Sequence, residues 1–157
     1  MDLTRLEYIK NINDSSDWAY KHYLVGSYFP LNFKKNEDSD SERVDNHALK
    51  LPKGSLIILS QRPPEHERYL THVVELVNEG SEDKPQWDTG EWGIIRWVKV
   101  HWVADFNDIS RIPLDREVMK TDWGWRNTTA KSLNGENLIK QWGSIDNLKT
   151  HLATVFN

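Results

Sequence analysis

The sequence predicts one α+β domain that is mostly β, with a curled sheet or barrel and helices at its edges. Short apolar and aromatic runs recur between turn signals such as Pro52-Lys53-Gly54 and Pro63-Pro64, a pattern typical of β-strands. Helical spacing of apolar residues occurs only near the two ends of the chain. The 157 residues hold no internal repeat, and this length suits a single domain, residues 1–157, with a sizeable core.

The N-terminal region predicts a helix, a strand and a loop, in that order. Four apolar residues recur every three positions: Leu3, Leu6, Ile9 and Ile12. This spacing predicts a short amphipathic helix over residues 3–12. Residues 18–29 are rich in aromatic side chains and predict a first strand that ends near Gly26-Ser27-Tyr28. Residues 34–47 are polar and strongly charged, which favours a loop.

The middle of the chain predicts three strands, over residues 55–60, 69–77 and 92–103. The polar stretch 78–91 predicts a long loop, and long loops in compact domains are often functional. Alternation predicts that one side of the last of these strands carries Ile94, Arg96, Val98, Val100 and Trp102, and that the other carries Ile95, Trp97, Lys99 and His101.

The C-terminal region predicts a final helix with Ser144 as its N-cap. Its buried face is predicted to hold Ile145, Leu148, Leu152, Val155 and Phe156. Trp142, just before this helix, is expected to pack the helix onto the sheet, and Trp18 is expected to anchor the first strand.

Composition narrows the function classes. Cysteine is absent, which excludes disulfides, thiolate zinc sites and cysteine nucleophiles. The net charge of -4 argues against strong non-specific binding to nucleic acid. Residues 1–90 carry 11 basic and 16 acidic side chains, whereas residues 91–157 carry 9 and 8, so a nucleic-acid surface should draw mainly on the second part. The first residues lack the zones of a signal peptide, which predicts a cytoplasmic location.

Motifs of known catalytic chemistry are missing from the sequence. It has no GxxxxGK[ST], GxGxxG, HExxH or GxSxG, and its six histidines are scattered without metal-ligand spacing. The sequence therefore predicts a protein that is not an enzyme and uses no cofactor or metal. His72, on an apolar strand face, is expected to be a core histidine with satisfied hydrogen bonds. His101 is expected to be half-exposed on its strand.

The tryptophans are the most informative residues. Trp87, Trp92, Trp97 and Trp102 lie five positions apart, and Trp123 and Trp125 follow. A step of five fits neither a helix face nor one face of a strand, so these rings cannot all enter the core from one regular element. Trp102 is expected in the core. For Trp97, which shares its side of the strand with Lys99 and His101, the sequence does not decide between core and pocket. Trp87 lies in a polar loop and Trp92 where that loop becomes a strand, so each ring either folds back onto the barrel or forms an aromatic pocket.

The order of these features resembles the YTH and EVE domains of the PUA-like superfamily, which are small β-barrel readers of modified bases. Five stretches carry the resemblance: residues 23–28 (Tyr-Leu-Val-Gly-Ser-Tyr), residues 52–60, residues 71–77, the pair Trp87-x4-Trp92, and residues 97–103. No single motif is specific; their order and spacing carry the resemblance, which covers roughly residues 18–104 and, more loosely, the C-terminal helix.

The resemblance implies a pocket that holds a flipped base. It makes Trp87 and Trp92 cage walls and places Ser27 and Tyr28 at the pocket floor or rim. Trp97 is expected to add a base contact. The segment Trp123-Gly124-Trp125-Arg126 has no counterpart in YTH domains and is expected to close the pocket from the other side, with Trp123 and Trp125 on the base and Arg126 and Lys131 on phosphates. Stacking on an aromatic ring contributes on the order of 1–3 kcal/mol per base.

Two departures from the family pattern favour an EVE-like prokaryotic reader over an adenine-specific YTH domain. Gly26 stands where the family has a lysine, and residues 29–50 hold no tryptophan, so only Phe29 or Phe33 could replace the missing cage ring. Such domains are linked to defence systems, which implies modified DNA or RNA as ligand and a nuclease or NTPase as partner. Two alternatives stay open: a protein-interaction or small-ligand module on the same barrel, and an ASCH-type RNA-processing enzyme, which would need convergent Lys, Asp or Glu side chains.

Overall fold

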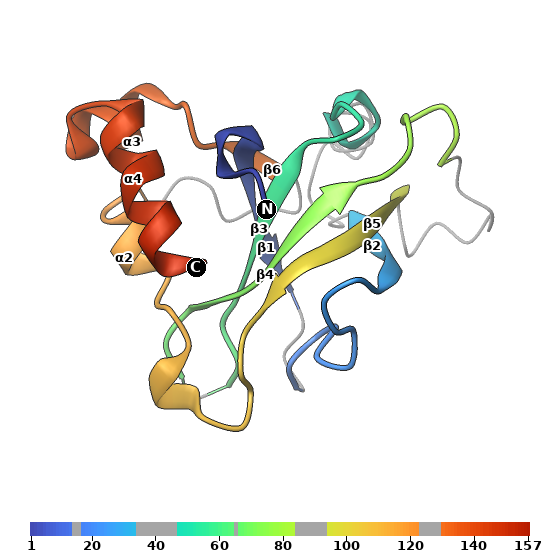
Figure 1. Cartoon of the computed structure of the whole chain (residues 1–157), viewed down its shortest axis with the longest axis horizontal. Coiled ribbons are helices and arrows are strands. Elements are labelled where there is room, and N and C mark those ends of the chain that lie inside the picture. Colours follow the sequence, from blue (N-terminus) through green and yellow to red (C-terminus); the bar gives the residue numbers. More distant parts are fainter. Residues whose placement is uncertain (14–16, 34–46, 65, 84–93, 123–129) are drawn as a thin grey trace.

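A six-stranded mixed sheet forms the centre of the molecule (Figure 1). The computed structural model describes residues 1–13, 17–33, 47–64, 66–83, 94–122 and 130–157. The strands are β1 Leu6–Ile12, β2 Tyr28–Phe33, β3 Leu56–Gln61, β4 Tyr69–Leu76, β5 Ile94–Val103 and β6 Ala130–Ser132. They lie in the order β2-β5-β4-β3-β1-β6. β1 and β3 are parallel, and the other neighbours are antiparallel.

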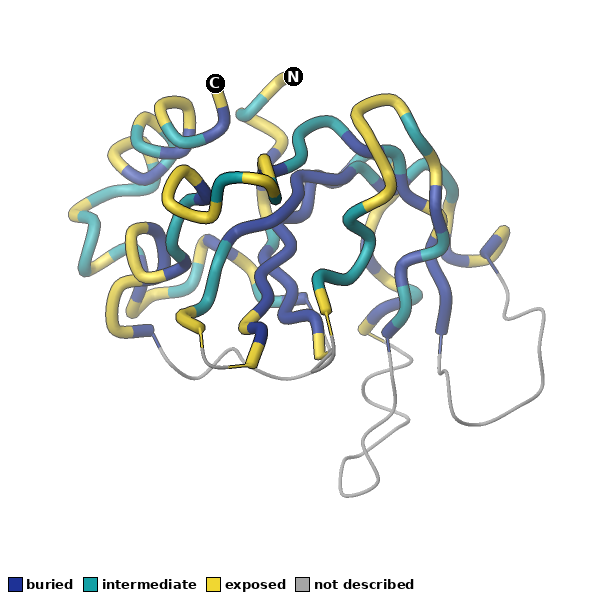
Figure 2. Tube along the Cα trace, turned by 90° about the horizontal axis from the view of Figure 1, so that it is seen from below, coloured by how far each residue is buried: buried dark blue, intermediate teal, exposed yellow. Residues whose placement is uncertain are grey.

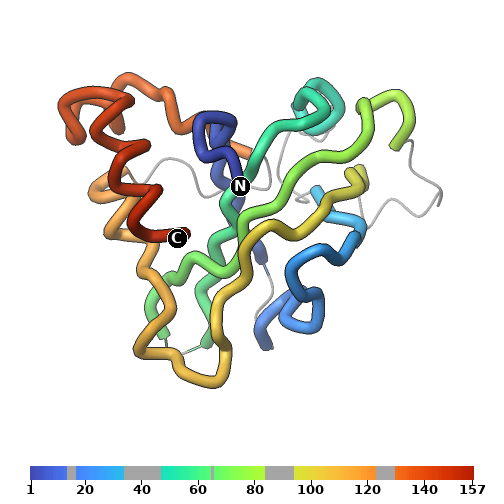
Figure 3. Tube along the Cα trace, in the orientation of Figure 1, coloured from blue at the N-terminus to red at the C-terminus, as the bar shows by residue number. Residues whose placement is uncertain are grey.

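Three helices gather on one side of this sheet, away from β2: α2 Arg116–Met119, α3 Glu136–Trp142 and α4 Ile145–Val155 (Figure 1). The short turns η1 Leu3–Arg5 and η2 Ile109–Arg111 lie outside this group, and residues 47–50 are helical on the side of the inner core. The two ends of the chain meet where α4 runs beside η1, and Lys149 Nζ donates a hydrogen bond to the Thr4 carbonyl oxygen over 2.7 Å (Figure 3). No helix of the described residues is long and apolar enough to cross a membrane.

The sheet is curled into an open half-barrel. β1 and β2 are separated in the sheet by three strands, yet Lys10 Nζ on β1 lies 4.7 Å from the centre of the Phe33 ring on β2. Register shifts in the ladders of β1 with β3, β3 with β4 and β4 with β5 add to the bend, because a bulge increases local twist and bending. The predicted fold class, α+β and mostly β with a curled sheet and flanking helices, is confirmed.

Each face of the sheet buries its own apolar core. The face inside the curl, called the inner face, holds the inner core: Ile12, Phe29, Leu31, Phe33, Ala48, Leu51, Ile57, Leu59, Val74, Leu76, Ile94, Val98, Val100 and Ala130. The opposite, outer face packs against α2, α3 and α4 through the outer core: Leu6, Ile9, Leu56, Ile58, Leu70, Val73, Val118, Met119, Leu133, Leu138, Leu148, Leu152 and Phe156. Neighbouring side chains of one strand therefore enter different cores.

The predicted strands of the middle region and the final helix are confirmed. Residues 55–60, 69–77 and 92–103 correspond to β3, β4 and β5, except that Trp92 lies outside the described residues. The Ser144 side chain accepts a hydrogen bond from the Asn147 amide at 3.1 Å and so caps α4. The predicted buried face of this helix packs in the outer core.

The predicted helix over residues 3–12 is wrong. Only Leu3–Arg5 form one 3-10 turn, and the rest is the strand β1. Leu6 and Ile9 share the outer core because a register shift between Leu6 and Tyr8 adds one residue to the strand. In a regular strand, side chains that face the same core are two residues apart. The bulge makes Leu6 and Ile9 three residues apart, a spacing that indicates a helix.

The predicted strand over residues 18–29 is also wrong. Residues 17–27 form turns, and the strand β2 begins at Tyr28. Tyr20 and Gly26 have φ values of 61° and 90°, which interrupt an extended chain. The aromatic content of this region serves packing instead, because the Tyr20 and Tyr23 rings both stack on Phe29.

Two tryptophan predictions are corrected in detail. Trp102 does not share a face with Ile94, Val98 and Val100, because the register shift beside it turns its ring to the outer core, 4.9 Å from the Phe156 ring. Trp18 belongs to no strand and contacts the rings of Tyr69 and Phe106. Trp142, the last residue of α3, packs against the outer core just before α4, as predicted, and its indole N–H donates to the Val118 carbonyl oxygen over 2.8 Å.

The cap of α4 gives a first testable expectation. Replacing Ser144 with alanine removes the acceptor for the Asn147 amide and should lower the free energy of unfolding by about 1 kcal/mol. Chemical denaturation measures this difference. The neighbouring exposed Asp146→Ala serves as control, and an S144A protein as stable as the wild type would contradict the capping role.

Candidate functional site

Four of the undescribed segments have at least one end at or next to a residue of the inner core. Ile12 precedes residues 14–16, Phe33 and Ala48 flank residues 34–46, Ile94 follows residues 84–93, and Ala130 follows residues 123–129. All five side chains are buried and belong to the inner core. Most of the flanking ends lie along the lower edge of the view in Figure 2. Four chain segments that are far apart in the sequence therefore each have an end at the inner core.

Two of these segments contain most of the residues predicted to hold a base. Trp87 and Trp92 fall in residues 84–93, and Trp123, Trp125 and Arg126 fall in residues 123–129. All five lie outside the described residues, so their assignment stays a prediction. A described anchor of each segment, Ile94 or Ala130, nevertheless belongs to the same buried cluster, the inner core.

A buried lysine lies at this convergence. Lys10 is paired with Ala130 in the ladder of β1 with β6, and its amine lies over the Phe33 ring. The side chain is only 2% exposed, and burial lowers the pKa of its amine to about 7. Its Nζ also donates to the Asn11 carbonyl oxygen over 3.4 Å. The Lys10 amine, a hydrogen-bond donor that is partly neutral at physiological pH, thus lies beside two segment ends. One is the start of the charged segment 34–46, and the other is the end of the tryptophan-containing segment 123–129.

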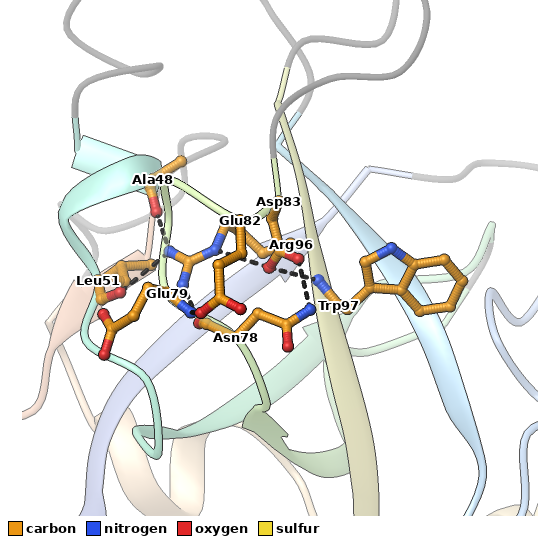
Figure 4. A network of polar contacts seen from close by, with 8 residues as sticks. All are labelled: Ala48, Leu51, Asn78, Glu79, Glu82, Asp83, Arg96 and Trp97. Atoms are coloured by element: carbon orange, nitrogen blue, oxygen red, sulfur yellow. Dashed lines mark hydrogen bonds and ion pairs between the residues drawn. The ribbon is translucent and has the colours of Figure 1, made fainter.

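A second buried cation ties two of the segments together at their bases (Figure 4). Arg96 is fully buried on β5, and its Nη1 donates to the carbonyl oxygens of Ala48 at 2.6 Å and Leu51 at 3.0 Å. Its Nη2 donates to the Asn78 carbonyl oxygen at 2.8 Å, and its Nε pairs with Asp83 at 3.2 Å. One guanidinium group therefore joins the chain that follows residues 34–46 to the chain that precedes residues 84–93.

Asp83 completes this network. Besides Arg96, its carboxylate accepts hydrogen bonds from the Trp97 amide at 3.0 Å and from the Asn78 side chain at 2.8 Å. Gly80 lets the two loop bases approach closely, because a Cβ atom there would lie 2.0 Å from the Leu49 carbonyl oxygen. The bases of the two loops are therefore fixed by hydrogen bonds and by backbone contact.

An ion pair closes the base of the third segment. Lys131, predicted to contact phosphate, lies on β6, and its Nζ is 2.5 Å from a carboxylate oxygen of Asp122. Asp122 directly precedes residues 123–129, and Lys131 is the second residue after them. The pair brings the two ends of that segment together. A phosphate contact by Lys131 stays a prediction.

The remaining predicted site residues face elsewhere. Tyr28 begins β2 and lies at the opposite end of that strand from Phe33. Tyr28 and Trp97 are 55% and 39% exposed on the outer face, while Phe29 and Val98 beside them enter the inner core. Ser27 is held by its main chain, whose carbonyl oxygen accepts from the Val100 amide. The structure thus brings Tyr28 and Trp97 to one surface, but not to the anchors of residues 84–93 within the inner core.

Two strand histidines, His72 and His101, fit structural roles. His72 is fully buried, and its ring nitrogens lie 2.9 Å from the Thr71 hydroxyl and 3.1 Å from the Tyr20 carbonyl oxygen, which confirms the predicted core histidine. Burial lowers its pKa to about 4. His101 is half-buried, and its Nε2 lies 2.6 Å from a carboxylate oxygen of Glu75. Within the described ranges no three His, Asp or Glu side chains lie close enough together to hold a metal ion.

Sequence reasoning missed Lys10 and the partners of Arg96. The signal for Lys10 was weak, because Lys10 lies beside the polar Asn11 between Ile9 and Ile12, in a stretch that was interpreted as a helix. The signal for Arg96 was an arginine in the middle of an otherwise apolar strand face, which calls for a buried acidic or carbonyl partner.

Comparisons with known proteins give one distant likeness. No family model and no curated protein matches the chain. A search of solved structures finds the YTH domain of the Zygosaccharomyces rouxii MRB1 protein in complex with N6-methyladenosine RNA. The likeness covers 90% of this chain and 86% of that one, with 15% sequence identity and a TM-score of 0.42.

Proposed function

We propose that the protein is a non-catalytic reader that binds a modified base of DNA or RNA in an aromatic pocket at the mouth of the curled sheet. The observation that carries this proposal is the convergence of the anchors of residues 34–46, 84–93 and 123–129 on one cluster. Two of these segments contain four of the eight tryptophans of the chain.

The chemistry of the region suits a flat, partly polar ligand. Indole rings stack on either face of a base and gain on the order of 1–3 kcal/mol per stacked ring. A flipped base also needs hydrogen bonds to its edge. Lys10 is a buried donor beside the anchors of these segments, and it keeps the donor role in both protonation states. The resemblance in the order of sequence features favours a methylated base over other flat ligands.

The rigid loop bases support a preformed pocket. The Arg96 network and the Lys131–Asp122 pair fix where the three segments leave the fold. A pocket whose walls are anchored loses less conformational entropy on binding than one built from free loops. An EVE-type family, a nuclease or NTPase partner and a cytoplasmic location remain predictions from the sequence.

Alanine at Trp87 and at Trp92, made singly, tests the proposal. Each variant is expected to bind a single-stranded oligonucleotide with one methylated base roughly 5- to 150-fold more weakly, the loss of one stacking partner. Fluorescence anisotropy with oligonucleotides bearing N6-methyladenine, 5-methylcytosine or no modification provides the measurement. Ile109→Ala, at an exposed apolar position on η2, is the control.

The result that would overturn the cage is unchanged affinity in both folded variants. The same titrations at several salt concentrations separate the alternative of a protein-interaction or small-ligand module. Binding through phosphates weakens steeply as salt rises, whereas binding of an apolar partner does not.

A further inference from the structure

An exposed aromatic surface lies on the outer face, outside the proposed pocket. In the ladder of β2 with β5, Tyr28 is opposite Lys99 and Pro30 is opposite Trp97. These four residues, called the outer platform, share a face because their sequence neighbours Phe29 and Val98 are buried in the inner core. Tyr28 and Trp97 are diagonal neighbours, about 7–8 Å apart, a separation that aromatic rings span.

The outer platform is basic as well as aromatic. Lys99 Nζ lies 5.8 Å from the centre of the Tyr28 ring. Lys99 is in turn opposite Glu75 of β4, and Glu75 is already paired with Arg5 at 2.7 Å and with His101 at 2.6 Å. Among the described residues, Asp2 and Glu75 offset Arg5 and Lys99 here, so Lys99, the cation that lies over the Tyr28 ring, is the group placed to contact an anionic ligand.

The backbone beneath the outer platform is held firmly. The Trp97 amide donates to Asp83, and the Trp97 carbonyl oxygen accepts from the Val77 amide at 3.1 Å. The turn before Tyr28 is fastened to β5, because Gly26 donates to the Val100 carbonyl oxygen at 2.9 Å and Val100 donates back to Ser27 at 2.9 Å. Exposed rings on such a rigid support lose little entropy when a ligand stacks on them.

We propose that the outer platform binds nucleotides that flank the base in the pocket, by stacking on Tyr28 and Trp97 and by a phosphate contact from Lys99. The proposal rests on the reader function proposed above and extends its footprint. Trp97 is three residues from Ile94 along β5, about 10 Å at about 3.3 Å per residue. One single strand can therefore reach from the anchor of residues 84–93 to this surface.

The rival occupant of this surface is a protein. The turn at its border exposes Leu24 and Val25 by 65% and 63%, and an apolar partner would use them. The Lys99–Tyr28 contact beside the exposed Trp97 ring favours the nucleic acid, because aromatic rings interleaved with cations are typical of single-strand binding surfaces. The two occupants differ in what an alanine variant should change.

The test compares strand lengths in Tyr28→Ala, Trp97→Ala and Lys99→Gln. Single-stranded DNA and RNA are titrated as a trinucleotide and as a nonanucleotide, each with and without a central methylated base. Each aromatic variant should bind the nonanucleotide roughly 5- to 150-fold more weakly and the trinucleotide as the wild type does. K99Q should flatten the slope of log Kd against log salt by about 0.7 for the nonanucleotide. Ile109→Ala is the control for loss of an exposed apolar side chain.

The readouts keep this proposal separate from the reader function. Preference for the methylated over the unmodified strand reports on the pocket, whereas the gain from trinucleotide to nonanucleotide reports on the outer platform. Nonanucleotide binding that is unchanged in both folded aromatic variants would overturn the proposal. The same holds if a wild-type self-association, seen by sedimentation, disappears in W97A while oligonucleotide binding does not change, because the surface would then belong to a protein contact.

Discussion

Replacing Arg96 with methionine is expected to lower the free energy of unfolding by about 3–5 kcal/mol. The guanidinium is fully buried and pairs with Asp83, and it donates to three carbonyl oxygens of the two loop bases. Methionine fills a similar volume, so the loss comes from the buried carboxylate and carbonyl oxygens that are left without this donor. Urea denaturation followed by circular dichroism measures the change.

Two further variants make this expectation specific. Arg96→Lys keeps the charge but not the planar fork of donors, and it should recover only part of the lost stability. Asp83→Asn combined with Arg96→Met should be less harmful than the sum of the single changes, because the unpaired buried charge is then removed. Additive losses in this double-mutant cycle would mean that Arg96 and Asp83 do not act as a pair.

Replacing Lys10 with methionine should stabilise the protein at pH 6 and remove a pH dependence of its stability. Burial lowers the pKa of the Lys10 amine to about 7, from 10.5 in an exposed lysine. Between these values the unfolded chain binds more protons than the folded one, so stability rises with pH from about 7 to about 10.5. Below pH 7 the Lys10 amine is charged in the folded state as well, and the fold bears the full cost of burying that charge. A shift from 10.5 to about 7, at about 1.4 kcal/mol per pH unit, makes this cost on the order of 5 kcal/mol.

The measurement is the free energy of unfolding of wild type and K10M from pH 6 to pH 10. The two curves should lie furthest apart at pH 6 and approach each other toward pH 10. Exposed Lys140→Met is the matched control, with no change in the slope of the curve expected. A constant difference between wild type and K10M at all pH values would show that the amine is not held in an apolar site.

K10M should also bind the oligonucleotide more weakly, since a buried group retained at a cost in stability is typical of a functional site.

The sequence allowed prediction of the elements whose patterns are local. β3, β4 and β5 follow from apolar runs between turn signals, and α4 follows from Ser144 and the helical spacing after it. β1 could not be found in this way, because one bulged residue gives Leu6 and Ile9 a helical spacing. The aromatic residues before β2 predicted a strand, but they pack as rings on Phe29 around a turned chain.

The candidate site was less predictable because its contacts are distant in the sequence. Arg96 meets partners that are 13 to 48 residues away, and only the folded sheet brings them together. Lys10 is buried by Phe33 from the far edge of the sheet, which follows from the curl and not from the local pattern. The side chains of Tyr28 and Trp97 face outward because of strand parity; the predicted strand 92–103 allowed this for Trp97, whereas the misplaced first strand concealed it for Tyr28.

The most direct test of the reader function is a titration of the wild-type protein with matched strands. Two single-stranded oligonucleotides of the same sequence, one with a single methylated base and one without, are compared at the same salt concentration by fluorescence anisotropy. The proposed pocket predicts at least about tenfold tighter binding of the methylated strand, which corresponds to about 1.4 kcal/mol. Equal affinity for both strands, across N6-methyladenine and 5-methylcytosine in DNA and RNA, would contradict it.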